Sequence, residues 1–482
     1  MWGFPRAFVA GLAGLSVALA SAEAADALLP DCASVRFPAP WHWHAASLGQ
    51  AQPRPATEAD GLRPLIEQVR AGKVVARYTS LGSSGRRSAE YVPDSVDASG
   101  GAFSRAPFMN YQDGDLFLVY PAVYSGPDQQ PWIGPKAPDR EGEQSGFRPV
   151  PSGITVRGVT LDGVRPVIRM AGQRAGENTL GQSAIYVAET QGVTIENIDV
   201  DGRGAIAVGK AGIYVNGAQD LTLRNMRITG FTGVNANGVF ATPQTGGTLT
   251  LENLILSGNG GDHGPEHNVY VNESEADPGF TVRMSGSWSS DVYYGHLFKS
   301  RAQRNLLVGN FFMGGNQRPG GEQREAYLVD IPDGGILEMR NNILVKGRSG
   351  ADSNGAFVTF GVESLGARPH ALSFEHNTLV ALSATFDGRH PLRPLFAPGL
   401  GRPRIAARVE SNALVGACRQ GARWPAALSA GNESIGFDAI RTDYTLVGAG
   451  RRPDQGIVGT PAYRHPAAGT VPRNRSTVGA LD

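Results

Sequence analysis

The sequence has no excess of charge of either sign. Its 44 Lys and Arg residues balance 44 Asp and Glu residues, and charged residues make up only 18% of the chain. A protein that binds nucleic acid through its phosphates needs a basic surface. We therefore do not expect nucleic acid as a partner.

Cysteine is almost absent, because Cys32 and Cys418 are the only two. This scarcity excludes a disulfide-dense scaffold, and no Cys/His spacing matches a zinc site. A bridge needs α-carbons about 4–7 Å apart, so the N-terminal segment would have to run the length of the molecule for these two to pair. Their pairing is left open. We expect no cofactor, and no clear acidic cluster supports calcium.

Long hydrophobic runs are absent beyond the N-terminus, where no stretch reaches the ~18 apolar residues of a membrane span. The single apolar run, Ala7–Ala20, follows the charge of Arg6 and precedes two possible cleavage sites, Ala20-Ser21-Ala22 and Ala22-Glu23-Ala24. This arrangement is typical of a secretory signal peptide. We predict a signal peptide over residues 1–24 and a periplasmic or secreted protein.

Glycine is abundant, with 64 residues, and one short phrase recurs: apolar residues at alternate positions, a central Asn, then two more alternating apolar residues. Val193–Val200 is one copy, and Gly158 holds the central position in an earlier copy. Such alternation indicates short strands. We expect the central asparagines to form a ladder at one turn, each amide bonding to the next coil. They are Asn197, Asn225, Asn253, Asn310, Asn342, Asn377 and Asn412.

A second family of short apolar segments lies between these phrases. The period of about 26–31 residues leaves no room for a helix and is too long for a leucine-rich repeat. It suits two or three short parallel strands in each coil, and a degenerate coil fits around Phe280–Trp288. The second-family segments are Ala184–Val187, Gly212–Val215, Gly238–Ala241, Asn268–Val271, His296–Lys299, Tyr327–Asp330 and Ala356–Thr359.

From about residue 112 to 425, the chain resembles the right-handed parallel β-helix superfamily of pectate-lyase-like proteins. The resemblance implies an all-β solenoid, with about nine coils at this length. We expect it over residues 111–425. An N-terminal cap over 25–110 contains an amphipathic segment with helical spacing, Leu62–Val69, and closing strands with a tail follow over 426–482.

Polar residues replace the aliphatic pattern in three successive second-family strands. We aligned these strands on Val269, Leu297 and Leu328, because side chains alternate between the two faces of a strand. One face then carries a column of Asn268, His296 and Tyr327, beside the aromatic residues Tyr270 and Phe298. The other face carries His267, Lys299 with Asp330, and Glu273 with Arg301.

Histidine, lysine, arginine and tyrosine side chains so close together suit the abstraction of a proton next to a carboxylate. We predict Lys299 or His267 as the base, with the pKa of Lys299 lowered by burial and by Arg301. We expect Arg301 to neutralise a uronate and Tyr327 or His296 to protonate the leaving oxygen. Substrate contacts are expected from Asn268, Tyr270, His263 and Asp330. Lys299 and Asp330 also suit a plain salt bridge, and the aromatic residues suit simple packing.

Lys299-Ser300, followed by Asn305 and Asn310-Phe311-Phe312, is similar to the catalytic-lysine strand of β-helix alginate and chondroitin lyases. That resemblance implies a lysine base assisted by an arginine one coil later. Here the next coil carries Asp330, and Arg301 lies in the same coil as the lysine.

The sequence therefore favours a monomeric lyase that cleaves an acidic polysaccharide by β-elimination. A glycoside hydrolase would use two carboxylates from Asp262, Glu266, Glu273 and Asp330. A C5-epimerase would share the proton abstraction of the lyase, and a non-catalytic glycan-binding or surface protein would need neither chemistry.

Overall fold

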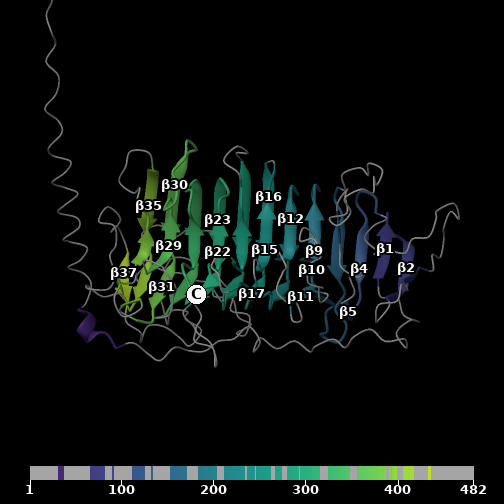
Figure 1. Cartoon of the computed structure of the whole chain (residues 1–482), viewed down its shortest axis with the longest axis horizontal. Coiled ribbons are helices and arrows are strands. Elements are labelled where there is room, and N and C mark those ends of the chain that lie inside the picture. Colours follow the sequence, from purple (N-terminus) through teal and green to yellow (C-terminus); the bar gives the residue numbers. More distant parts are fainter. Residues whose placement is uncertain are drawn as a thin grey trace, which may run out of the picture.

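The structure is a computed structural model, and it describes residues 31–36, 66–81, 89–91, 111–124, 132–133, 152–170, 183–202, 211–233, 236–244, 246–261, 266–273, 279–292, 294–314, 324–347, 355–383, 385–386, 390–391, 393–398, 405–416 and 432–435. These residues form a right-handed parallel β-solenoid with almost no helix, which confirms the predicted fold class. The strands of each sheet follow one another along the long axis of the molecule (Figure 1).

Three sheets form the walls of the solenoid. Sheet 1 has the spatial order β3 (Ala89–Tyr91), β2 (Lys73–Leu81), β1 (Ile66–Arg70), β4 (Leu116–Val119), β7 (Thr155–Gly158), β10 (Thr194–Glu196), β13 (Leu221–Arg224), β16 (Gly247–Glu252), β19 (Phe280–Ser285), β23 (Arg304–Val308), β27 (Ile336–Arg340), β30 (His370–Glu375) and β35 (Ile405–Glu410).

Sheet 2 has the order β37 (Glu433–Ile435), β36 (Ala413–Val415), β31 (Thr378–Ala381), β28 (Ile343–Lys346), β24 (Phe311–Gly314), β20 (Trp288–Ser290), β17 (Ile255–Ser257), β14 (Arg227–Thr229), β11 (Asp199–Asp201), β8 (Val167–Arg169) and β5 (Val123–Tyr124).

Sheet 3 has the order β34 (Arg393–Phe396), β29 (Ala356–Phe360), β26 (Val329–Ile331), β22 (Phe298–Ser300), β18 (Val269–Val271), β15 (Asn237–Thr242), β12 (Ala211–Asn216), β9 (Ser183–Ala188) and β6 (Trp132–Ile133). Two short pairs complete the described strands, β21 (Tyr294–Gly295) with β25 (Arg324–Glu325) and β32 (Thr385–Phe386) with β33 (His390–Pro391).

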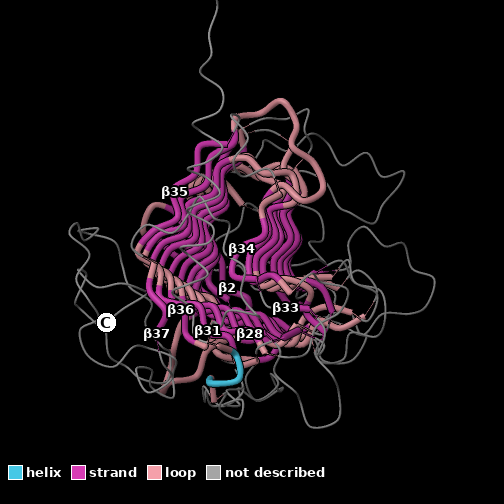
Figure 2. Tube along the Cα trace, turned by 90° about the vertical axis from the view of Figure 1, so that its left-hand side faces the viewer, coloured by secondary structure: helices cyan, strands magenta, loops and turns pink. Residues whose placement is uncertain are grey.

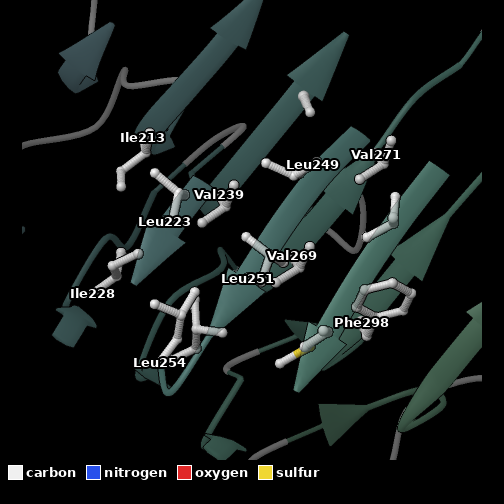
Figure 3. Close-up of a cluster of buried hydrophobic side chains, with 14 of the residues drawn as sticks. Ile213, Leu223, Ile228, Val239, Leu249, Leu251, Leu254, Val269, Val271 and Phe298 are labelled. Carbon is white, nitrogen blue, oxygen red and sulfur yellow. The ribbon is translucent and has the colours of Figure 1, made fainter. Parts of the chain in front are cut away.

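Each coil passes through sheet 1, sheet 2 and sheet 3 in turn, so the three sheets surround one apolar interior (Figure 2). In β16, Thr248 and Thr250 are half-buried on the outside, whereas Leu249 and Leu251 are buried inside. Figure 3 shows how inward side chains from the three sheets meet, among them Leu223 of sheet 1 and Val239 of sheet 3. Burial of these stacked apolar columns is the main stabilising contribution to the fold.

The recurrent asparagines occupy two neighbouring positions of the turn between sheets 1 and 2, not one. Asn197, Asn225 and Asn253 share the predicted turn column, with left-handed φ values of 58°, 52° and 52°. Asn and Gly tolerate this conformation better than other residues, which explains their recurrence there. In the later coils, Gly309 and Asn341 take the left-handed position instead.

The later asparagines lie one residue further along and point inward, which corrects the expectation of a single ladder. The Nδ2 of Asn310 donates to Oδ1 of Asn342 at 3.1 Å, and the backbone N–H of Asn310 donates to the same oxygen at 2.9 Å. The pattern repeats from Asn342 to Asn377, from Asn377 to Asn412 and from Asn412 to Asn432. Buried amides remain stable here because each finds its partners in the next coil.

The segment with helical spacing near the N-terminus is not a helix in its described part. Ile66–Arg70 is the strand β1, which pairs antiparallel with both β2 and β4 and so extends sheet 1. Ile66 and Gln68 are buried, and the residue between them is half-buried, as expected for a strand. Over so short a run, the pattern of apolar residues does not distinguish a strand from a helix.

The short 3₁₀ helix η1 (Cys32–Ser34) lies at the end of the solenoid opposite β1, near the C-terminal strands (Figures 1 and 2). The N-terminal segment therefore does reach the far end of the solenoid. Cys418 and the predicted signal peptide lie outside the described residues. None of the helices in the described part of the chain is long and apolar enough to cross a membrane.

Candidate functional site

The polar patch predicted from the sequence lies on sheet 3, across β18, β22 and β26. In the observed register, Lys299 pairs with Tyr270 on one side and with Asp330 on the other. The alignment of Leu297 with Leu328 agrees with this register, but the alignment of Val269 with Leu297 is wrong by one residue. A shift of one residue moves every side chain of a strand to the opposite face.

The corrected register places Lys299 on the outside of the solenoid. It continues an outward column whose members are Tyr186, Tyr214, Phe240, Tyr270, Lys299, Asp330, Thr359 and Phe396. Phe298, predicted to stand beside Tyr270, instead points inward and is fully buried in the core (Figure 3). The outer surface of sheet 3 therefore changes from aromatic to charged between β18 and β22.

The aromatic part of this column is a packing ladder. The rings of Tyr214, Phe240 and Tyr270 stack with centroids 5.4 and 5.3 Å apart, so their faces contact one another. Tyr186 continues the row at 5.3 Å from Tyr214. Because each ring covers its neighbour, the column favours packing over a sugar platform.

Asn268 does not share the column of His296 and Tyr327, as the sequence analysis predicted. Its side chain is buried, and Nδ2 donates to Ser289 Oγ and to the Ser290 carbonyl, both at 2.9 Å. Its Oδ1 accepts a hydrogen bond from Asn259 at 2.9 Å. Asn268 therefore closes the corner between sheets 2 and 3 and is not available to a substrate.

His267 takes the place predicted for Asn268, so the outer column at the start of these strands is His267, His296 and Tyr327. The ring centroids lie 4.8 and 5.1 Å apart in succession. The Nδ1 of His267 accepts the backbone N–H of His296 at 2.9 Å, and the Nδ1 of His296 accepts that of Tyr327 at 3.0 Å. The side chains thus bond each coil to the next.

These hydrogen bonds determine the tautomer of both imidazoles. A neutral ring that accepts at Nδ1 carries its proton on Nε2. The Nε2 of His296 lies 3.4 Å from Asp330 Oδ2, which suits this tautomer. Gly295 makes the close approach possible, because a Cβ there would meet the Glu266 carbonyl oxygen and His267 Nδ1.

Burial keeps both histidines neutral near pH 7. Burial, then the charges of His296, Lys299 and Arg301, lower the pKa of His267 well below its usual value. Burial lowers the pKa of His296 to about 4, even though the Asp330 carboxylate acts in the opposite direction. Neither ring offers an unprotonated nitrogen to a ligand, because Nδ1 is already engaged in both.

Lys299 is an ion-paired ammonium, not the poised base that the sequence analysis predicted. Its Nζ lies 3.1 Å from Asp330 Oδ2 and 3.0 Å from Glu363 Oε1. Burial lowers the pKa of Lys299, but the two carboxylates outweigh burial and raise the pKa above its usual value. The expected pair with Asp330 does form, on the outer face of the sheet. Asp330 also accepts the Thr359 hydroxyl at 2.5 Å.

Arg301 makes contacts other than the one expected with Glu273. Its Nη1 donates to both oxygens of Asp333 at 2.8 Å, and its Nη2 lies 2.6 Å from Glu363 Oε2. Its Nε donates to the Tyr270 hydroxyl at 3.4 Å. Glu273 is buried instead beneath the strand ends, where it accepts backbone N–H groups.

Four groups near the site were not predicted from the sequence, and one of them is Asp333, whose carboxylate binds Arg301. Glu363 and Arg368 belong to the segment between β29 and β30, two coils beyond Lys299, and Arg368 donates to the Arg301 carbonyl at 2.8 Å. Lys346 is fully buried in sheet 2 and donates to the Ala326 carbonyl at 3.1 Å. Nothing in the local sequence around these residues indicates their position, because the contacts depend on the coil lengths in between.

His263 and Asp262 lie outside the described residues. Among the residues that are described, no group of three or more His, Cys, Asp and Glu side chains is arranged to hold a metal ion. No protein-family model, curated protein or solved structure matches the chain. The fold and the geometry of this site are therefore the basis for a functional proposal.

We expect the protein to lose stability as the pH falls from about 6.5, the usual pKa of histidine, to about 4, the pKa of His296 in the folded chain. In this range the unfolded chain binds a proton at this position and the folded chain does not. About 3 kcal/mol of the free energy of unfolding should disappear through His296 alone. Urea unfolding at a series of pH values measures this loss.

The matched variant is His296→Asn, whose side-chain oxygen replaces Nδ1 as an acceptor for the Tyr327 N–H but does not titrate. Between about pH 6.5 and 4, this variant should lose less free energy of unfolding than wild type, by the about 3 kcal/mol that His296 contributes. An identical pH profile in both proteins would contradict a neutral, buried His296.

Proposed function

We propose that the protein is an exported, polysaccharide-active β-helix protein that binds an acidic polysaccharide over β18, β22 and β26 and cleaves it by β-elimination. The observation that supports this most is the convergence of Lys299 and Arg301 on one carboxylate, that of Glu363. β-Elimination begins by removing the proton next to a uronate carboxylate. Two cations on that carboxylate stabilise the charge that develops.

The roles of the side chains follow from their contacts. Lys299, with its raised pKa, acts with Arg301 to neutralise the uronate, in place of the base role expected from the sequence. The phenol oxygen of Tyr270 accepts a hydrogen bond from Arg301 and so lies beside the neutralising pair, and Tyr270 is the proposed base. Tyr327, at the end of the histidine stack, donates the proton to the leaving oxygen. No bound cofactor takes part in this proposal.

Three alternative functions each have an observation in their favour. Asp330 and Glu363 both contact Lys299 Nζ, so their contacting oxygens are at most about 6 Å apart, a spacing near that of glycosidase carboxylate pairs. Asp330 is only 1% exposed, however, which disfavours a hydrolase. A C5-epimerase would use the same neutralising pair as the lyase. The dense pairing of charges in the site suits a non-catalytic glycan-binding or surface protein.

A panel of alginate, pectin and glycosaminoglycan separates these functions. Ultraviolet absorbance of an unsaturated uronate product indicates a lyase, and new reducing ends without that absorbance indicate a hydrolase. Changed uronate configuration without cleavage indicates an epimerase, and binding alone indicates a non-catalytic protein. An absence of binding to every acidic polysaccharide would contradict the proposal.

Lys299→Ala should lower turnover at least ~10²-fold if the ammonium stabilises the transition state. Arg304→Ala, on the exposed outer face of sheet 1, is the matched control and should leave turnover unchanged. If Lys299 serves only its pair with Asp330, replacing both residues by Val should leave activity intact. That result would overturn the catalytic role of Lys299.

We also propose a solenoid of about nine coils, closed by an N-terminal cap over 25–110 and by C-terminal strands and a tail over 426–482, in a monomeric periplasmic or secreted protein. The apolar run after Arg6 and the small residues after Ala20 support export. The mature chain should begin between Ser21 and Asp26. Mass spectrometry of the protein from its native host would contradict export if it found an intact Met1.

A further inference from the structure

Glu363 has an unusual position among the charged groups on sheet 3. It belongs to the segment between β29 and β30, yet its carboxylate reaches back to β22, two coils earlier. Oε1 lies 3.0 Å from Lys299 Nζ, and Oε2 lies 2.6 Å from Arg301 Nη2. Two cations thus bind the two oxygens of one carboxylate, each through a charge-assisted hydrogen bond.

The two cations are held in place without Glu363. Lys299 pairs with Asp330, a carboxylate whose side chain is 2% exposed. Arg301 makes two bonds to Asp333, whose side chain is 8% exposed, and a third to the Tyr270 hydroxyl. The side chain of Glu363, by contrast, is 47% exposed. Glu363 is therefore the exchangeable partner in this network, because exposed ion pairs contribute little stability.

The backbone next to Glu363 is anchored separately from its side chain. The N–H groups of Glu363 and Ser364 donate to the Pro332 carbonyl at 3.0 and 3.1 Å, and Gly361 donates to the Ile331 carbonyl at 2.8 Å. Rotation of the Glu363 side chain alone would free one donor on Lys299 and one on Arg301. No movement of the loop is needed.

We propose that Lys299 and Arg301 form a binding site for the carboxylate group of an acidic ligand, and that Glu363 occupies this site until the ligand displaces it. The site recognises a planar group with two anionic oxygens, since that is the group it already holds. Exchange of one carboxylate for another leaves the charge of the network unchanged. The identity of that ligand as a uronate rests on the proposed function, whereas the carboxylate site itself does not.

The first test uses acetate as the probe. In Glu363→Ala, sodium acetate should give a saturable rise in melting temperature that sodium chloride at equal ionic strength does not give. Wild type should need a higher acetate concentration for the same rise, because its own carboxylate competes for the site. The control is Glu338→Ala, which removes an ion-paired carboxylate from sheet 1. The absence of an acetate-specific rise in Glu363→Ala, or an equal rise in Glu338→Ala, would overturn the proposal.

The second test measures the affinity for an acidic oligosaccharide by titration calorimetry. Removing the competing carboxylate should tighten binding at least ~10-fold in Glu363→Ala. The reason is that the apparent affinity of a site is reduced by the fraction of molecules in which the site is free. Glu363→Gln keeps the size of the side chain but removes its charge and one of its two acceptor oxygens, and it should also bind more tightly than wild type. This variant serves if Glu363→Ala does not fold.

The outcomes separate this inference from the proposed function. An acetate effect with no binding to any acidic polysaccharide would support the carboxylate site and contradict the polysaccharide function. Binding or cleavage of a polysaccharide with unchanged or weaker affinity in both Glu363 variants, and no acetate effect, would contradict the displacement of Glu363 and leave the proposed function standing.

Discussion

The register between neighbouring parallel strands is the constraint on which the rest of this structure depends. Each parallel strand contributes two to six residues, and alternate residues face the core or the solvent. A change of one residue would exchange the two sets. The pairing of Tyr270 with Lys299 puts the ammonium outside, and it leaves Phe298 to fill the core. The outward position of Lys299 in the proposed site, between Tyr270 and Asp330, follows from that pairing.

The same stacking solves the problem of polar groups in a narrow solenoid. Identical amides repeat at the inward turn position, so each buried group finds its partner one coil away. The histidine stack uses this principle on the outer face, where Nδ1 of His267 and His296 accepts a backbone N–H from the next coil. Burial keeps these rings neutral near pH 7, which leaves Lys299 and Arg301 as the cations of the site.

The sequence alone predicted the strands of the fold better than it predicted the register between strands of neighbouring coils. Alternating apolar residues identified both strand families, and Asn197 and Asn225 marked a turn that needs the left-handed conformation. The spacing of the asparagines along the sequence cannot distinguish this left-handed turn position from the next position in the turn, where Asn310 points inward. Prediction of the site also required the register between β18 and β22, and the length of chain between successive coils is irregular. The predicted register was wrong by one residue at this pair, and it placed Asn268 on the wrong face. Glu363 could not be predicted, because its contacts join residues more than 60 positions apart.

Disulfide trapping measures the register at β18 and β22 directly. Residues directly opposite each other in paired strands have α-carbons close enough for a disulfide, and their Cβ atoms lie on the same face of the sheet. Residues that are one position out of register point to opposite faces and cannot form the bridge. The variant with Cys at 270 and 299 should form the bridge on mild oxidation, and the variant with Cys at 270 and 298 should not. Cross-linking of 270 with 298 but not with 299 would contradict the outward position of Lys299 and the site built on it.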